Sequence, residues 1–497
     1  MAAAAQPARK SYFFEKGYQY MAATIKGAWA RNGASIQRYR DHLNGLGDKG
    51  VTARVFLAIA NILAMAAVVV CGSLITAAIT LVNVLVLVVF MAVLYLGFTA
   101  IWAVDRLYLV HKRIFTACHE CKKKSLIPTY LCPRCGAKHT NLTPGVYGIL
   151  RRTCSCGEKL PTTFFNGRKN LEAECPRCGH RLADRESRPL CIPVVGGRSV
   201  GKTAYITAFA KRFIEFVAPQ KGLEIEFYNQ AKEDIYGEIK ADFAHGSTRM
   251  TARPQDLSQT SSVSLSFFIK HKSLQPERLV HIYDIAGEVF TNNDENEVQQ
   301  QYEYCQGIIF MIDPFAIPTV RAQYESQLTP EDRAGIGKAD INGVINVFLN
   351  KLREVTGLSD QKMAKVPLAV VIGKTDSADL AENFSEEKVE ELQMLYPQAQ
   401  LNANDAVDYL CRKFLRENEM GGFVNAIEMK FSENRFFAAS AIGHTRNAGP
   451  YNPKGVLEPV EWICSLADKR LASLWVSGQY GKTPVDERAL AGKEAQA

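Results

Sequence analysis

A run of fifty residues, 55–104, contains no Lys, Arg, Asp or Glu. As one helix it would be about 75 Å long, more than twice the roughly 30 Å of a bilayer core. The run therefore predicts two membrane-spanning helices, 55–74 and 78–104, that turn near Gly72 and Ser73. A buried helical hairpin in a soluble protein is the alternative. The position and length of the run exclude a cleaved signal peptide.

Basic residues flank the apolar run on both sides. A helical hairpin returns the chain to the side from which it started, and basic flanks favour the cytoplasmic side. We therefore expect a multi-pass protein of the cytoplasmic membrane, with both termini in the cytoplasm. The net charge of +8 fits attraction to anionic lipid, and we find no motif for nucleic-acid binding. The flanking residues are Arg31, Arg38, Arg40, Lys49 and Arg54 before the run, and Arg106, Lys112, Arg113 and Lys122 to Lys124 after it.

Eight of the thirteen cysteines lie between Cys118 and Cys178 and form four closely spaced pairs. Two such pairs can hold one tetrahedral zinc ion in a zinc ribbon, and an all-thiolate site is structural because it leaves no open position. Disulfides are the alternative, which a cytosolic location disfavours. His139 or His180 could replace one ligand. We predict two tandem zinc ribbons, pairing Cys118 and Cys121 with Cys132 and Cys135, and Cys154 and Cys156 with Cys175 and Cys178.

A glycine-rich loop follows a short apolar stretch, 190–195, that is typical of a buried strand. Helical sequence begins at Ala204, so the order is strand, loop and helix, as in phosphate-binding loops. Backbone N–H groups there surround a phosphate, Lys202 adds a positive charge, and the Thr203 hydroxyl can bind Mg²⁺. A glycine-rich turn that matches by chance is the alternative. The loop consists of Gly196, Gly197, Arg198, Ser199, Val200, Gly201, Lys202 and Thr203.

Strands and helices alternate after residue 189, which predicts a doubly wound α/β domain with a mostly parallel sheet. Ligands bind such sheets at the carboxyl ends of the strands. The expected strands are 190–195, 262–270, 279–283, 307–312, 366–372 and 435–439, and the expected helices include 341–355, 404–416 and 460–475.

Three of the strand ends carry residues suited to a guanine nucleotide. Asp284 can hold Mg²⁺ through water, and the N–H of Gly287 can face the terminal phosphate. The Asp376 carboxylate can accept two hydrogen bonds from guanine, a donor pair that adenine lacks, while Lys374 lies along the base. The loop at Ser440, Ala441 and Ile442 can offer a backbone N–H to the guanine oxygen. A solvated surface pair is the alternative for Lys374 and Asp376.

With these motifs in this order, residues 189–476 resemble the small GTPases of the Ras and Rab type, and within them the bacterial double-GTPase families. The resemblance implies a P-loop GTPase that binds GTP and GDP with Mg²⁺ and hydrolyses GTP slowly. It also implies effector proteins and an activating partner. It covers neither the apolar run nor the cysteines.

Several positions depart from the small GTPase pattern. Glu288 stands where many have a glutamine that orients the attacking water. Arg198 occupies a position that is often glycine, and it could block a partner's arginine finger, act as an internal one or face solvent. Gly373 replaces the usual Asn or Thr before Lys374. The first switch falls in 222–260, with Thr251 favoured over Thr248 and Thr260 as the Mg²⁺ ligand. The second is expected at 292–301.

The predicted organisation has five parts: 1–54, a basic and aromatic helical segment; 55–104, the membrane hairpin; 105–185, the zinc ribbons; 186–476, the GTPase domain; and 477–497, a polar tail. The leading hypothesis is a membrane-anchored GTP switch with Lys202, Glu288 and Arg198 at its catalytic centre. The alternative is a non-enzymatic adaptor that bound nucleotide stabilises.

Overall fold

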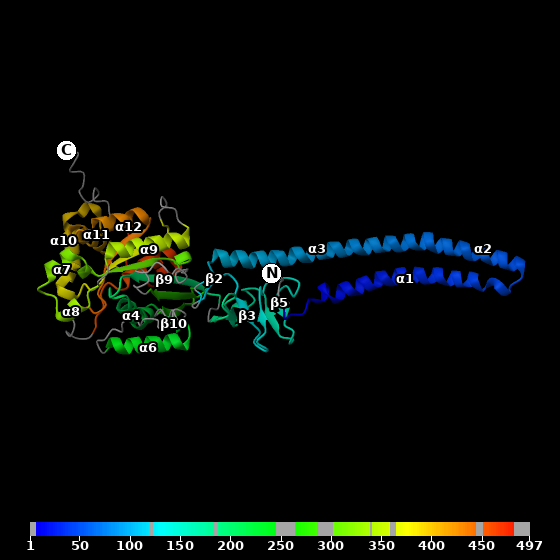
Figure 1. The fold of residues 1–497 in the computed structure, drawn as a ribbon, viewed down its shortest axis with the longest axis horizontal. Coiled ribbons are helices and arrows are strands. Elements are labelled where there is room, and N and C mark those ends of the chain that lie inside the picture. The colour runs from blue at the N-terminus through cyan, green and yellow to red at the C-terminus, as the bar shows by residue number, and fades with distance from the viewer. Residues whose placement is uncertain are drawn as a thin grey trace, which may run out of the picture. The chain divides into compact units, whose positions relative to one another are not determined.

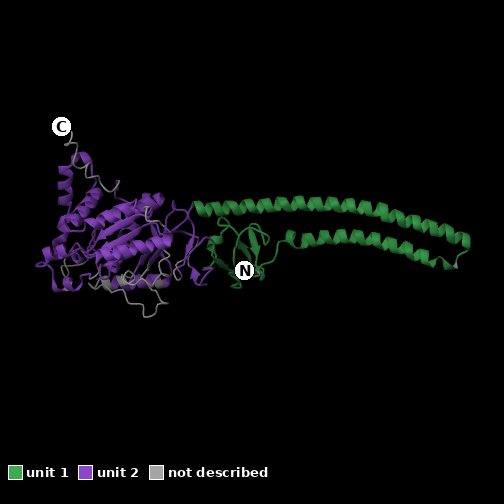
Figure 2. Ribbon diagram, turned by 45° about the horizontal axis from the view of Figure 1, so that its top comes forward, with its two compact units in different colours: residues 1–111, 127–174 green, residues 112–126, 175–497 purple. Residues whose placement is uncertain are grey.

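The fold is described from a computed structural model, in which the chain forms two compact units (Figure 2). Unit 1 comprises Met1–His111 and Ile127–Glu174, and unit 2 comprises Lys112–Leu126 and Cys175–Ala497. The chain therefore enters unit 2, leaves it after Leu126 and returns at Cys175. The structure describes residues 6–118, 121, 123–182, 186–244, 264–285, 302–337, 340–357, 364–443 and 451–481.

One continuous apolar helix dominates unit 1. It consists of α2 (Val51–Ala67), a π-helical turn (Val68–Gly72) and α3 (Ser73–His111). Among the described residues it is the single helix that is long and apolar enough to cross a membrane. The predicted turn near Gly72 is therefore wrong. The predicted multi-pass topology, with both flanks on one side of a membrane, depended on that turn and is not supported by one continuous helix.

The π-helical turn explains why Gly72 does not end the helix. A π turn widens the backbone and weakens its hydrogen-bond ladder locally, and a polar group from elsewhere can fill the gap. Here the Asn32 amide of α1 (Lys16–Asn44) donates to the Gly72 carbonyl at 3.1 Å and to Thr76 Oγ1 at 2.7 Å. A neighbouring helix therefore stabilises the site where the sequence predicts a turn.

Helix α1 runs antiparallel to this apolar helix and packs along it (Figure 1). The Trp29 indole donates to Thr80 Oγ1 at 3.2 Å, and the rings of Phe13 and Phe90 meet edge to face, 5.4 Å apart. As residue numbers rise along α1 they fall along α3, so the direction follows from these contacts alone. Helix α1 lies within the segment 1–54 that was expected to be helical, and it has a packing partner that its sequence did not indicate.

The rest of unit 1 is a small β module. Strand β3 pairs antiparallel with both β4 and β7, and β5 pairs with β6. The N-terminal segment joins this module through a bridge between Ala8 and Cys154. The strands are β3 (Thr129–Leu131), β4 (Lys138–His139), β5 (Arg151–Thr153), β6 (Lys159–Pro161) and β7 (Ala173–Glu174).

Unit 2 is built on a seven-stranded mixed sheet in the order β10-β11-β12-β9-β13-β14-β15 (Figure 1). The five strands from β12 to β15 in this order are parallel, and β11 is antiparallel to both of its neighbours. All six predicted strands are present, and β10 is an addition. Their bounds are β9 (Arg188–Gly196), β10 (Glu224–Phe227), β11 (Ser264–Lys270), β12 (Arg278–Asp284), β13 (Ile308–Ile312), β14 (Leu368–Ile372) and β15 (Asn434–Ala438).

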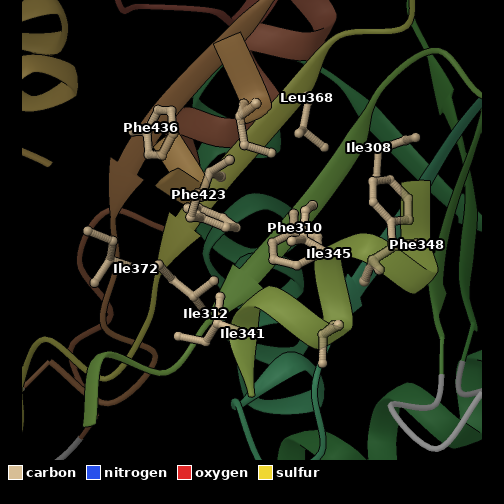
Figure 3. Packing of buried hydrophobic residues seen from close by; sticks show 14 of the residues in the cluster. Ile308, Phe310, Ile312, Ile341, Ile345, Phe348, Leu368, Ile372, Phe423 and Phe436 are labelled. Carbon is tan, nitrogen blue, oxygen red and sulfur yellow. The ribbon is translucent and has the colours of Figure 1, made fainter. Parts of the chain in front are cut away.

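Helices cover both faces of this sheet, as the doubly wound prediction requires. Alternate residues of each central strand enter opposite cores, because side chains alternate along a strand. On one face Phe310 of β13 contacts Phe348 of α9 and Phe423 of α12 (Figure 3). The helices are α4 (Lys202–Arg212), α5 (Ala218–Gln220), α6 (Gln230–Ala244), α7 (Pro318–Tyr324), α8 (Pro330–Ala334), α9 (Ile341–Thr356), α10 (Glu386–Leu395), α11 (Ala403–Glu417), α12 (Gly421–Lys430), α13 (Glu458–Ala467) and α14 (Lys469–Trp475).

Two predicted segments of unit 2 differ from the structure. The long first-switch segment, 222–260, begins with regular structure, since β10 and α6 occupy most of its first half. The predicted helix 460–475 is divided into α13 and α14. The Asp468 side chain causes the break, because it caps α14 by accepting from Leu471 N and also pairs with the buried Arg278.

Candidate nucleotide and zinc sites

The glycine-rich loop joins β9 to α4 at the carboxyl edge of the sheet. Gly196 is required by packing, since a Cβ there would lie 2.4 Å from the Met311 carbonyl oxygen of the neighbouring strand β13. Ser199 and Gly201 have φ of 63° and 90°, which turns the backbone sharply before the helix. Left-handed residues that alternate with a residue of other conformation, here Val200, turn successive backbone N–H groups toward a common centre, the geometry of an anion-binding nest.

Lys202 is the first residue of α4 and is almost fully buried. Its ammonium group donates to the carbonyl oxygens of Gly196 at 3.0 Å and Gly197 at 2.8 Å, so the loop is wrapped around its own lysine. Burial lowers the pKa of Lys202, and the nearby Asp284 carboxylate acts in the opposite direction. A polyphosphate would supply the negative charge that compensates for this burial.

The Thr203 hydroxyl and Asp284 meet beside the loop. Thr203 Oγ1 donates to Asp284 Oδ2 at 2.6 Å, and Asp284 is fully buried at the end of β12. Strands β12 and β9 are parallel neighbours, with Asp284 opposite Val194, so their carboxyl ends lie together. A hydroxyl and a carboxylate are the oxygen ligands that Mg²⁺ prefers, and the pair fits one such ion.

Lys374 lies at the other end of the site, where β14 has ended. Its ammonium group contacts Asp313 Oδ2 at 2.6 Å and the Gly335 carbonyl at 2.8 Å. Asp313 directly follows β13, is fully buried, and accepts further bonds from the backbone N–H groups of Phe315 and Gly337. Asp313 has no predicted role in the sequence, although its position after an apolar strand is the same signal that singled out Asp284.

Asp376 is positioned by the loop after β15. Ser440 Oγ donates to Asp376 Oδ1 at 2.5 Å and accepts from the N–H of Gly443 at 2.7 Å. Ser440 is itself tied to Lys454 by two backbone hydrogen bonds. The two predicted guanine-reading loops are therefore in direct contact, and one carboxylate oxygen of Asp376 is oriented by a serine of the other loop.

Other predicted site residues lie outside the described part of the chain or away from the loop interior. The positions of Thr251, Gly287, Glu288 and the segment 292–301 are outside it, as are Thr248 and Thr260. Arg198 is exposed at the turn of the loop, and its carbonyl oxygen lies close to Gly337. The three roles considered for its side chain are therefore still predictions.

The eight clustered cysteines form two groups, each with its sulfur atoms within 4.8 Å of one another. The predicted pairing is wrong. The first cysteine cluster, in unit 2, contains Cys118, Cys121, Cys175 and Cys178, and the second cysteine cluster, in unit 1, contains Cys132, Cys135, Cys154 and Cys156. The second cluster is thus inserted in sequence between the two halves of the first.

The geometry of both clusters fits zinc. Sulfur–sulfur distances are 3.5 Å between Cys118 and Cys178 and 3.6 Å between Cys135 and Cys154. A tetrahedral site with zinc–sulfur bonds of about 2.3 Å requires separations of about 3.8 Å, whereas a disulfide requires about 2.05 Å. A backbone hydrogen bond at Glu158 lowers the pKa of Cys156 to about 7, whereas burial raises the pKa of Cys154 to about 12.

Long-range packing explains the nested pairing. The repeated Cys-Pro-Arg-Cys-Gly turns are alike, with Gly136 and Gly179 at φ 67° and 73°. The antiparallel β3–β7 ladder pairs Thr129 with Glu174, so Cys132 and Cys175 continue from opposite ends of it. Cys118 stays near Cys175 because the residues preceding it are packed in the core of unit 2.

Metal analysis of double variants separates the two pairings. We expect the full chain to hold two zinc equivalents, and Cys118→Ser with Cys175→Ser to leave one, because both changes fall in the first cluster. Cys118→Ser with Cys132→Ser should leave none. The sequential pairing predicts the reverse, so elemental analysis of the purified proteins under reducing conditions decides between them. Two equivalents retained in both variants would contradict zinc binding at these cysteines.

Comparisons with known proteins support a GTPase-like region. The family model described as Double-GTPase 2 matches residues 190–407, which is less than half of the chain. The matched part begins in β9, includes the glycine-rich loop and contains the Lys374–Asp376 loop. The fold is mixed α/β, and the matched region contains the site described above except for the Ser440 loop.

The chain is also similar to a curated protein of Mycolicibacterium smegmatis (strain ATCC 700084 / mc(2)155), named “Putative ESX-1 scaffolding and assembly protein SaeC”. The identity is 21% over 321 residues, covering 59% of this chain and 79% of that protein. Among solved structures, the Arl6 BBS3 small GTPase of Trypanosoma brucei, with a bound nucleotide analogue, gives 11% identity and a TM-score of 0.22. The aligned part is 58% of this chain and 99% of that chain. The signal recognition particle receptor SRb-GTP/SRX complex of Chaetomium thermophilum gives 12% identity and a TM-score of 0.23. The aligned part is 52% of this chain and 94% of that chain.

Proposed function

We propose that this protein is a GTP-binding switch that hydrolyses GTP with Mg²⁺ and is attached to a membrane by its apolar helix. The observation that carries the proposal is the gathering of three elements at one edge of the parallel sheet: the loop of Lys202, the Thr203–Asp284 pair, and the contact between Asp376 and Ser440. The family match over residues 190–407 supports the same assignment.

The chemistry follows from these residues. Lys202 and the backbone of its loop bind the phosphates, and Asp376, held by Ser440, binds the guanine. Thr203 and Asp284 would hold Mg²⁺, which would supply positive charge beside the phosphates. Catalysis of this kind is positioning and electrostatic stabilisation. Glu288 and Arg198 stay as proposed contributors to water placement and charge stabilisation, and Thr251 as the proposed first-switch ligand.

The apolar helix supports attachment to a bilayer. Most large apolar side chains of α2 and α3 are exposed in the structure, including Phe56, Leu81 and Leu96. Exposure of apolar surface on this scale marks a membrane or protein contact. About 20 residues suffice to cross a bilayer core, so a helix of 61 residues is long enough to cross and extend beyond it.

Replacing Lys202 with alanine tests the enzymatic part of this proposal. We expect turnover of GTP to fall about 100-fold or more, because one preorganised charge on the transferred phosphate contributes on this scale. Lys221→Ala, which removes an exposed lysine of the same unit, is the matched control and should turn over like the wild type. The measurement is phosphate release from full-length protein in detergent, with and without cell extract.

A non-enzymatic adaptor is the second candidate, and the name of the mycobacterial relative, a scaffolding and assembly protein, favours it. In this case the nucleotide would stabilise a docking platform for protein partners without turnover. Wild-type phosphate release equal to that of Lys202→Ala under both conditions, together with nucleotide binding by the wild type, would favour the adaptor over the enzyme.

A further inference from the structure

The first cysteine cluster belongs to unit 2, which also contains the candidate nucleotide site. Two of its ligands, Cys118 and Cys121, precede the glycine-rich loop by more than seventy residues. A hairpin of β1 (Thr116–Ala117) and β2 (Lys124–Ser125) carries Cys118 and Cys121. Ala117 is fully buried in the core that also contains Val195 of β9 and Ile312 of β13, the strands on which the nucleotide site is built. The hairpin is therefore part of the core of unit 2.

Two contacts join this hairpin to residues that precede β13. The rings of Phe115 and Tyr304 meet edge to face with centroids 5.8 Å apart. Lys124 Nζ pairs with Glu303 Oε1 at 2.7 Å. The pair is about half exposed and adds little stability. The ring contact and the burial of Ala117 therefore hold the hairpin against the residues before β13, and the ion pair is a minor addition.

Tyr304 in turn connects to the Mg²⁺-binding end of β12. Tyr283, which directly precedes Asp284, shares the same buried core. Tyr283 and Tyr304 are both almost fully buried in this core. A connected path thus leads from Asp284 along the backbone of β12 to Tyr283, through the buried core that Tyr283 shares with Tyr304 and Ala117, and by ring contact from Tyr304 to Phe115.

We propose that the first cysteine cluster is a metal-stabilised sensor of the nucleotide state, an interaction surface within the chain that reads Asp284 through Tyr283 and Tyr304. The inference rests on the proposed nucleotide binding. Nucleotides that place different charge beside Asp284 shift the residues of this path differently, and the metal holds the hairpin in the arrangement that fits one of them. Such a link between two sites is reciprocal: metal changes nucleotide preference by the same factor as nucleotide changes metal affinity.

The test measures the ratio of GDP to GTP-analogue affinity in the full-length protein in detergent. Removing the first cluster with Cys118→Ser and Cys178→Ser should change this ratio by about fivefold or more, the lower range of known linkages. The matched control removes the second cluster, in unit 1, with Cys132→Ser and Cys156→Ser, and should leave the ratio within about twofold.

A second measurement avoids dependence on folding of the first-cluster variant. The Cys132→Ser, Cys156→Ser protein is loaded with Co²⁺, so that its visible thiolate absorption reports the first cluster alone. Exchange of GDP for the GTP analogue should shift this spectrum, and Phe115→Ala should abolish the shift. The inference is overturned if the protein binds both nucleotides, yet the Co²⁺ spectrum does not change with the nucleotide and the affinity ratio does not change when the first cluster is removed. The proposed function would then be unaffected. Absence of any guanine nucleotide binding would overturn both.

Discussion

Replacing Asp376 with asparagine is expected to lower affinity for GTP by about 100-fold or more and to raise affinity for xanthosine triphosphate. The carboxylate accepts two hydrogen bonds from the guanine edge, and bonds to a charged group contribute about 1.5–3 kcal/mol each. The asparagine amide presents a donor where guanine also presents donors, whereas xanthine offers a carbonyl oxygen at that position. The Ser440 contact is retained, because the amide oxygen of asparagine can accept from it.

Asp379→Asn is the matched control for this prediction. Asp379 lies three residues further along, is exposed, and has a positive φ of 55° that asparagine tolerates. Affinities for both nucleotides should stay at the wild-type value in that variant. The measurement is competition binding with the two triphosphates on full-length protein. Equal affinity of wild type for ATP and GTP, or an Asp376→Asn variant that still prefers GTP, would show that this loop does not read the base.

The location of the candidate residues was predictable from sequence, because they lie at strand ends or in the loops that follow them. A short apolar run that stops at a glycine or aspartate indicates a strand end, and parallel strands bring such ends together, so Lys202, Asp284 and Asp376 were expected at one edge of the sheet. Asp313 met the same criterion and was still missed, because its partner Lys374 is assigned by a contact between two loops. The local sequence pattern thus predicts where such an aspartate lies in the fold, whereas its role depends on which residue it contacts.

The pairing of the cysteine knuckles and the course of the apolar run at Gly72 were not predictable, because both depend on residues that are distant in the sequence. Each cysteine pair has the spacing of a metal knuckle, yet the partner of each pair is determined by the packing of Ala117 in the core of unit 2 and by the β3–β7 ladder. Likewise, the apolar run does not reveal whether Gly72 ends a helix. That outcome depends on the Asn32 amide, forty residues away, which supplies a donor at the π-helical turn.

Removing the Asp105 carboxylate is expected to destabilise unit 1 by about 3–5 kcal/mol, because it leaves a buried arginine without its counter-ion. Asp105 is the first charged residue after the apolar run, and it lies fully buried against Arg168, with Arg168 Nη1 2.9 Å from Asp105 Oδ2. Its other oxygen accepts from the Phe164 N–H at 2.8 Å. The pair therefore fastens the end of α3 to the module that carries the second cysteine cluster.

Two further variants make this prediction specific. Asp105→Ala combined with Arg168→Met should recover much of the loss, since removing both charges leaves none buried and unpaired. Lys138→Ala breaks the Lys138–Glu174 pair of the same unit, in which the lysine is 62% exposed, and should cost less than about 1 kcal/mol. Hydrogen exchange over residues 127–174 in the full chain measures the free energy of local opening. Exchange in Asp105→Ala that matches Lys138→Ala would mean that the buried pair does not hold α3 and the module together.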